Sequence, residues 1–382
     1  MPDYMENALE LLDEPGEWYH DRAQNILYYL PLPTEEPETT EVIAPVLERL
    51  VEVHGTIDAE VHDLTFRGIT FAHATWMRPS TEFGHIDIQA NFTPDPEPAH
   101  DFWRDSSVIM IHNQDIKSPG AVVVSAGQSI TFERCNFTEL GGAGLDLENG
   151  TNTSNVIGSR FFDISGSGIQ VGDVLEQDHH PTDPKFIVKN NVIANNFLHD
   201  LGQEFQGGIG IFVGYTDGTV IEHNELVDLP YTGISLGWGW GEEDIGGGEL
   251  AQPFLYTTPT VAANNRVEYN HIHNVMQNRS DGGGIYTLGV QPNTVIRGNY
   301  IHDSPAACGI YLDQGSGLIE TTGNLVHDVS QSLCMNNYYL GRDETCSVHD
   351  NAFDQEPDQA ANLAQLASEA GIQPDYQDIL TH

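Results

Sequence analysis

Positive charge is scarce in this sequence. Its 382 residues include 14 Lys and Arg against 57 Asp and Glu, so the formal net charge is −43. Such a charge repels phosphate backbones and anionic membrane surfaces, and we predict neither nucleic-acid nor membrane partners. The sequence also has no apolar run of about 18 residues, the minimum for a membrane-spanning helix.

Cysteine is rare as well, with four residues and no Cys-x-x-Cys spacing. No metal-binding pattern with histidine is formed by these residues, which are Cys135, Cys308, Cys334 and Cys346. Whether two of them form a disulfide stays an open question. We therefore predict no metal and no organic cofactor. Residues 1–12 carry acids where a secretory signal carries bases, so we expect no signal peptide in this chain and leave open whether it is secreted or cytoplasmic.

A repeated four-residue phrase predicts the fold class. A small residue is followed by alternating apolar positions at 144–147, 168–171, 210–213, 233–236, 284–287 and 309–312, with a degraded copy at 334–337. Four of the six steps are close to 24 residues. A second phrase, which contains Asn and often His-Asp, precedes most copies. Three short strands per coil of this length predict an all-β, right-handed parallel β-helix, with the asparagines stacked in an internal ladder.

The repeat also predicts the domain organisation. We expect an N-terminal hairpin and cap region over 1–52, the β-helix over 53–353, and a C-terminal helical cap or tail over 354–382. Two steps of the repeat are too long. They indicate excursions from the coils at 172–186 and 237–263, and long loops in a regular solenoid usually serve function.

The third position of each phrase should face outward, because side chains alternate along a strand. These residues form a predicted surface, the strip: Asp146, Gln170, Phe212, Ser235, Tyr286, Tyr311 and Asn336. Polar groups mixed with aromatic rings are typical of a saccharide-binding groove, although they also fit an ordinary exposed sheet. As substrate-binding residues we predict Trp238, Trp240, Tyr286, Tyr311, Tyr215, His180, Glu204 and Tyr338. His180 has a second interpretation, a metal ligand together with Asp183.

Two aspartates in glycine-rich motifs are the predicted catalytic pair. Asp313 follows its phrase among aromatic neighbours that favour a protonated carboxyl, so we assign it as general acid. Asp281 opens the motif DGGG, which we expect to be more open, and we assign it as the base that activates water. Their places on adjacent coils favour a wide carboxyl spacing and inversion of configuration. Glu204 and the acids at 242–244 are reserve candidates.

Several longer motifs resemble glycoside hydrolase family 141. They are HHPTDP at 179–184, the run 208–241, DGGGIYTLGVQPNT at 281–294 and GIYLDQGS at 309–316. The resemblance implies a β-helix hydrolase of a plant or algal polysaccharide, of the fucoside or xylan type, with two catalytic aspartates that match Asp281 and Asp313. The family usually reads Asp-Glu where this chain has Asp313-Gln314.

Two other functions compete with hydrolysis. A polysaccharide lyase needs a cation beside the substrate carboxylate, which the strip hardly offers, although acidic loops are able to hold Ca²⁺. A non-catalytic carbohydrate-binding β-helix needs only the groove. The carbohydrate is the predicted partner in all three cases, and the oligomeric state stays open.

The charge distribution generates a test of salt adaptation. Acids are spread along the whole chain, whereas lysine occurs only at Lys117, Lys185 and Lys189. At about 1 M salt the Debye length falls to about 3 Å, so self-repulsion is screened. We expect the thermal unfolding midpoint to rise from low to multi-molar KCl. A midpoint that is flat or falls with salt would contradict adaptation.

Overall fold

The computed structural model describes residues 7–81, 84–85, 87–94, 115–245, 256–336 and 345–381. The chain divides into two compact units, Met1–Ala44 and Pro45–His382. Within the described residues, no helix has the length and apolar character needed to cross a membrane.

The first unit contains a β-hairpin. Its strands β1 (Trp18–Asp21) and β2 (Ile26–Tyr29) pair antiparallel. A single 3-10 turn, η1 (Leu9–Leu11), precedes them. The unit ends before the predicted boundary at residue 52, because β3 (Val51–His54) already belongs to the coils of the second unit.

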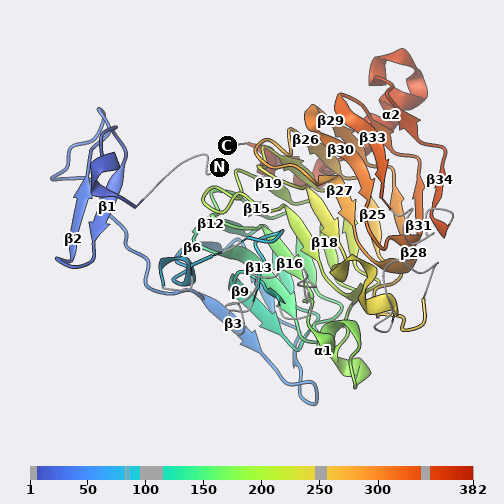
Figure 1. The fold of residues 1–382 in the computed structure, drawn as a ribbon, viewed down its shortest axis with the longest axis horizontal. Coiled ribbons are helices and arrows are strands. Elements are labelled where there is room, and N and C mark those ends of the chain that lie inside the picture. Colours follow the sequence, from blue (N-terminus) through green and yellow to red (C-terminus); the bar gives the residue numbers. More distant parts are fainter. Residues whose placement is uncertain are drawn as a thin grey trace, which may run out of the picture. The chain divides into compact units, whose positions relative to one another are not determined.

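The second unit is a stack of parallel coils whose strands form three nine-stranded sheets (Figure 1). The first sheet contains β5 (Thr65–Arg67), β11 (Thr131–Glu133), β14 (Asn155–Ile157), β18 (Val192–Ala194), β22 (Val220–Glu222), β25 (Arg266–Glu268), β28 (Val290–Arg297), β31 (Gly317–Thr322) and β34 (Ser347–His349). The second contains β6 (Thr70–Ala74), β12 (Asn136–Leu140), β15 (Arg160–Phe161), β19 (Phe197–His199), β23 (Glu225–Val227), β26 (His271–His273), β29 (Tyr300–His302), β32 (Leu325–Val326) and β35 (Ala352–Phe353).

The third sheet carries the repeated phrase and is called the strip sheet. It contains β3, β9 (Gly120–Ser125), β13 (Ala143–Glu148), β16 (Ile169–Val171), β20 (Ile211–Val213), β24 (Ile234–Leu236), β27 (Gly283–Thr287), β30 (Ser304–Leu312) and β33 (Val329–Met335). Two further parallel pairs join β4 (Val61–His62) to β10 (Gly127–Gln128) and β17 (Val188–Lys189) to β21 (Thr216–Asp217). The predicted parallel β-helix is confirmed.

Alternation along each strand decides which side chains enter the core. In the strip sheet, one column of isoleucines pairs from coil to coil and is fully buried: Ile169, Ile211, Ile234, Ile285 and Ile310. Successive coils lie about 4.8 Å apart, so each such column buries apolar surface without interruption along the stack.

A column of asparagines closes one corner of the coils, as predicted. Its members are Asn196, Asn224, Asn270, Asn299, Asn324 and Asn351. Each side-chain oxygen from Asn224 onward accepts the backbone N–H and the side-chain amide of the preceding member at 2.9–3.1 Å. The ladder therefore satisfies buried backbone groups where the chain turns between two sheets.

Three long excursions leave the coils. The segment 172–186 includes α1 (Glu176–His179) and η4 (Pro184–Phe186), and 237–263 includes η5 (Gly239–Gly241) and η6 (Glu243–Ile245). The third, 75–119, was not predicted, because it precedes the first clear copy of the phrase. Its described parts include η2 (Arg78–Ser80) and an antiparallel pair, β7 (Thr93–Pro94) with β8 (Asp115–Ile116).

The C-terminal segment packs along the side of the stack. After η9 (Pro357–Gln359), the helix α2 (Ala361–Glu369) places Leu363 against Leu325 of a late coil. The following η10 (Pro374–Leu380) places Ile379 against Phe197 of an earlier coil. The tail thus runs back over several coils and does more than cover the last one.

The asparagine ladder makes a testable contribution to stability. Replacing Asn224 with Ala strands the carbonyl of Ile193 and the N–H of Asn196, both of which bond its side chain at 2.9 Å. Each stranded buried group costs about 1–3 kcal/mol, so we expect a loss of roughly 2–6 kcal/mol in the free energy of unfolding. Denaturant unfolding measures it. Asn362→Ala, at an exposed position of α2, is the matched control, and an equal effect of the two variants would contradict the ladder's role.

Candidate active site

The register of the strip sheet places the predicted strip. Asp146, Gln170, Phe212, Ser235, Tyr286 and Tyr311 pair in sequence from coil to coil, as expected. The last copy was assigned wrongly, because Cys334 and not Asn336 pairs with Tyr311. A slip of two residues keeps side chains on the same face, so alternation alone does not detect it. The true register brings Asn336 beside Asp313.

Most of the strip is covered by the excursion 75–119. The Phe92 ring lies 4.9 Å from the ring of Phe212 and 4.5 Å from that of Trp238, measured between centroids. The amide of Gln170 donates to the hydroxyl of Ser118 at 3.2 Å.

Lys117 of the same excursion covers the acidic start of the strip. Its ammonium group is 2.8 Å from Asp146, 3.2 Å from Glu148 and 3.3 Å from Asp173. One of only three lysines therefore neutralises a buried group of acids. The part of the strip from Asp146 to Ser235 is buried, so it provides no open groove.

Two predicted substrate-binding aromatics belong to the core. Trp238 is 1% exposed, and its indole N–H donates to Asp115 Oδ2 at 3.0 Å. Tyr215 is 4% exposed, and its hydroxyl donates to the carbonyl of Trp238 at 3.0 Å. The predictions that these rings stack on sugars are wrong, because other rings pack on them. Phe92 of the excursion 75–119 lies 4.5 Å from Trp238, and His179 of the excursion 172–186 lies 5.3 Å from Tyr215, measured between centroids.

The other predicted contacts are dispersed. His180 bonds His179 and donates to the carbonyl of Thr258 at 3.0 Å, so it joins the two later excursions. Asp183 caps η4 by accepting the N–H of Lys185 and does not join His180. Trp240 is partly buried against the core, and Glu204 is exposed on a loop away from the pocket residues given below. Tyr338 lies outside the described residues.

The reserve acids at 242–244 also serve the excursions. Asp244 is buried and accepts the N–H of Val290 at 2.9 Å. Glu243 lies 3.5 Å from Nε2 of His179. Neither residue lines the pocket.

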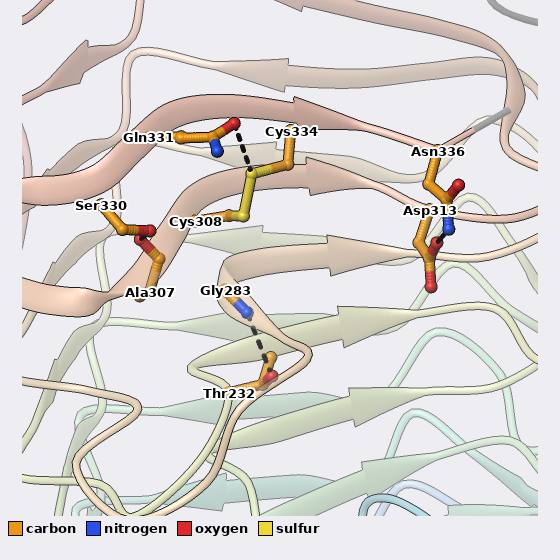
Figure 2. Close-up of a disulfide and its surroundings, with 9 residues drawn as sticks. All are labelled: Thr232, Gly283, Ala307, Cys308, Asp313, Ser330, Gln331, Cys334 and Asn336. Carbon is orange, nitrogen blue, oxygen red and sulfur yellow. Dashed lines mark hydrogen bonds between the residues drawn. A yellow bond between two sulfur atoms is a disulfide. The ribbon is translucent and has the colours of Figure 1, made fainter. Parts of the chain in front are cut away.

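Among the described residues, an open pocket of about 400 Å³ lies at the last coils of the strip sheet. Its lining residues come from the last coils: Asp281, Gly282, Ala306, Cys308, Tyr311, Gln331, Cys334, Met335 and Asn336. A disulfide joins Cys308 of β30 to Cys334 of β33, and Figure 2 shows it on the same pair of strands that lead to Asp313 and Asn336. This pairing, left open by the sequence, ties together two strands of the pocket wall.

Asp313 lies behind the pocket wall in a polar network. It is 4% exposed and does not itself line the pocket. The hydroxyl of Tyr286 donates to its Oδ2 at 2.5 Å, and the side-chain amide of Asn336 donates to its Oδ1 at 2.9 Å (Figure 2 shows the second bond). Tyr286 is therefore a buried partner of the carboxylate, and not a substrate-stacking ring as predicted.

Asp281 faces the pocket from the bend before β27. Its φ is +63°, so the residue itself turns the chain. The hydroxyl of Tyr231 donates to its carbonyl at 2.7 Å and holds the bend in place. This bend brings the Asp281 carboxyl to Tyr311, whose hydroxyl interacts with both Asp281 and Asp313. The two aspartates of the predicted pair are thus brought together at one tyrosine.

The pKa shift of Asp281 does not fit the role of base that the sequence predicted for it. Burial and then the charge of Asp313 raise the pKa of Asp281, and the hydrogen bond from Tyr311 partly opposes them. We had expected Asp281 to stay ionised in an open bend. A raised pKa instead suits a group that must carry a proton, while Asp313 already accepts hydrogen bonds on both oxygens.

Sequence reasoning missed the support that the excursion 75–119 gives to this site. The amide of Gln89 donates to the hydroxyl of Tyr231 at 2.8 Å and to that of Tyr286 at 3.4 Å. Asp87 lies nearby, accepts the N–H of Asn91 at 3.2 Å, and has its pKa raised to about 6 by burial. Only the long gap in the repeat before residue 120 signalled that this segment had a role.

Comparisons with known proteins agree with this architecture. A model described as right-handed β-helix region matches residues 100–242, and one described as GH141 insertion domain matches residues 1–32. A solved structure titled "Glycoside hydrolase" is 32% identical, with a TM-score of 0.81 over 97% of this chain. The chain spans 61% of the length of that protein.

Two further solved structures are more distant. The A-module of the Azotobacter vinelandii mannuronan C-5 epimerase AlgE6 is 13% identical, with a TM-score of 0.44 over 61% of this chain and 56% of its own. A complex of XylC with xylose is also 13% identical, with a TM-score of 0.48 over 86% and 48% of the two chains. No curated protein sequence matches the chain.

The fold and these likenesses define the class. The chain is a right-handed parallel β-helix. More narrowly, its residues 1–32 are similar to the GH141 insertion domain, and 97% of the chain is similar to a solved glycoside hydrolase.

The position of Trp238 generates a stability prediction. Its burial against Phe92 and its bond to Asp115 make it a core residue, so Trp238→Ala should lower the free energy of unfolding by about 3–5 kcal/mol. Thermal or denaturant unfolding measures the loss. Trp18, which is 65% exposed, provides the matched Trp→Ala control. Wild-type stability with weakened glycan binding would restore the sugar-stacking interpretation.

Proposed function

We propose that the protein hydrolyses a glycosidic bond in the pocket at the last coils, with Asp281 and Asp313 as the two carboxyl groups. The observation that carries this proposal is their convergence on Tyr311, with Asp281 facing an open pocket and influenced by the charge of Asp313. Two carboxyl groups with different environments are what acid-assisted glycoside hydrolysis requires. The likeness to a glycoside hydrolase over 97% of the chain supports the same reaction class.

In this mechanism Asp281 is the general acid. Its proton passes to the glycosidic oxygen as the bond from that oxygen to the anomeric carbon breaks, and the leaving sugar departs as an alcohol. Asp313 takes a proton from the attacking water, whose oxygen forms the new bond to the anomeric carbon. Proton transfer from bulk water then returns both carboxyls to their starting states. We retain inversion as part of the proposal, because a base acting on water gives that outcome.

Three side chains position the pair. Tyr286 and Asn336 hold the two oxygens of Asp313, and Tyr311 bridges the carboxyls. The side-chain amide of Gln89 donates to the hydroxyls of Tyr231 and Tyr286 and so holds both rings in place. Substrate approach to Asp313 passes Tyr311 and Asn336, which line the pocket in front of it.

For the substrate we propose a class of polysaccharide and not a particular sugar or linkage. A fucoside- or xylan-type plant or algal polysaccharide follows from the sequence resemblance. The covered strip leaves a pocket of about 400 Å³ in place of a long groove, which favours binding of a chain end. The acidic composition supports operation in concentrated salt.

The competing functions differ in what the pocket must contain. A lyase must neutralise a uronate carboxylate, and the described pocket lining contains no Lys or Arg. A pure binding module has no need for Asp281 to carry a proton. Release of a product that absorbs in the ultraviolet would favour the lyase, and glycan binding without cleavage would favour the binding module.

Substitution of either aspartate tests the proposed reaction. Asp281→Asn and Asp313→Asn should each lower the hydrolysis rate by about 10²–10⁴-fold, because the acid or the base is lost. The assay measures new reducing ends on a polysaccharide panel in concentrated salt, including xylans and fucose-containing glycans. Asp163→Asn is the matched control, because Asp163 is an exposed aspartate that follows β15. Activity that survives both substitutions would overturn the pair.

The pH dependence tests the assignment of the acid. Asp281 must be protonated, so activity should fall as the pH rises through its raised pKa. Tyr311 lowers that pKa, so Tyr311→Phe should move the alkaline limb of the pH–rate profile to higher pH, with a reduced maximum rate. An alkaline limb that moves to lower pH would contradict Asp281 as the acid.

A further inference from the structure

Two histidines and a glutamate meet on the outer face of the second sheet. His271 Nδ1 lies 2.9 Å from Glu225 Oε2, and His273 Nε2 lies 2.9 Å from Glu225 Oε1. The three ligand atoms of this group lie within 4.8 Å of one another. No part of the proposed hydrolysis uses them.

The sheet geometry explains this convergence. His271 and His273 are two positions apart on β26, so both face outward while Ile272 enters the core. Glu225 pairs with His271 on the neighbouring strand β23. A His-x-His pair with a carboxylate from the next strand presents three ligands from rigid backbone.

The three side chains are shielded without being closed off. Glu225 is 14% exposed, His271 23% and His273 24%. The C-terminal tail passes over the group, because His223 donates to the carbonyl of Gly371 at 3.2 Å and Gly371 approaches both Glu225 and His271 closely. An ion here has restricted access to water and an open side for entry.

The hydrogen bonds around His271 and His302 cannot all form if both imidazole rings are neutral. His271 Nδ1 must donate to the carboxylate of Glu225, and His302 Nδ1 must donate to Asp303 Oδ2 at 2.8 Å. The two remaining nitrogens, His271 Nε2 and His302 Nε2, then face each other at 2.7 Å with no proton between them. The two rings need one additional positive charge, supplied by a proton on one imidazole or by a metal ion at the three ligand atoms.

A metal ion removes this inconsistency. When His271 Nδ1 and His273 Nε2 coordinate a metal, His271 takes the Nε2–H tautomer and donates to His302. His302 then keeps its Nδ1–H for Asp303. A ligand histidine whose other N–H is fixed by a hydrogen-bonded partner is typical of protein metal sites.

We propose that Glu225, His271 and His273 bind one divalent transition-metal ion such as Zn²⁺, with His302 and Asp303 as outer partners. Two imidazoles and one carboxylate favour zinc-like ions over Ca²⁺ or Mg²⁺, which prefer oxygen ligands. The sequence had predicted no metal. The site lies on a different sheet from the pocket, where an ion strengthens the contact between coils and the C-terminal tail.

Calorimetric titration of the chelator-treated full chain with Zn²⁺ tests the proposal. We expect one site per chain, at least tenfold weaker in His273→Ala and in Glu225→Gln, and a Zn²⁺-dependent rise of the unfolding midpoint only in the wild type. Glu225→Gln keeps the side-chain shape and covers the case in which the histidine variant does not fold. His349→Ala, which removes an exposed histidine beside Glu320 and Asp350, should bind as the wild type does.

A second probe separates this site from the two thiols outside the disulfide. Cys135 and Cys346 are not in the disulfide, so binding through sulfur must be distinguished. Co²⁺ alone should give visible ligand-field bands without a thiolate charge-transfer band. No binding, a thiolate band, or unchanged affinity in both variants would overturn the proposal.

Discussion

Hydrogen bonding between successive coils sets the position of every functional side chain in this protein. Each strand of the strip sheet pairs in parallel with the next, so a residue's level and face are fixed by its neighbours. The isoleucine columns and the asparagine ladder enforce that register from inside the stack, because a slip would bury polar groups or strand buried amides. Asp313, Tyr286 and Tyr311 are near one another because their coils are adjacent and in register.

The excursion 75–119 decides where this regular scaffold is open. Phe92 and Lys117 of this segment pack over the early and middle coils of the strip. Gln89 supports the tyrosines beneath the candidate active site. Among the described residues, the open pocket lies at the last coils, where the disulfide between β30 and β33 fixes two pocket strands.

The period of the phrase was sufficient to predict the coils, the ladder and two excursions, because burial on stacked strands leaves a regular pattern. The same pattern placed Tyr286 and Tyr311 on one face. It was unable to show that Trp238 and Tyr215 are covered, because the covering residues lie in excursions that have no repeat. Phe92 and Asp115 contact Trp238, and His179 contacts Tyr215. The two-residue slip at Cys334 was invisible for a related reason, because it preserves alternation. The exchange of roles that we propose for the aspartates depends on the surroundings of Asp281, which turns the chain at a φ of +63° that spacing does not reveal.

The central claim is that Asp281 and Asp313 act as one unit on one bond. The most direct measurement is the hydrolysis rate of the double variant Asp281→Asn/Asp313→Asn beside the two single variants. Residues that act together are strongly non-additive, so the double variant should be no slower than about the slower single variant. Rate losses that multiply, as for two independent sites, would contradict the account.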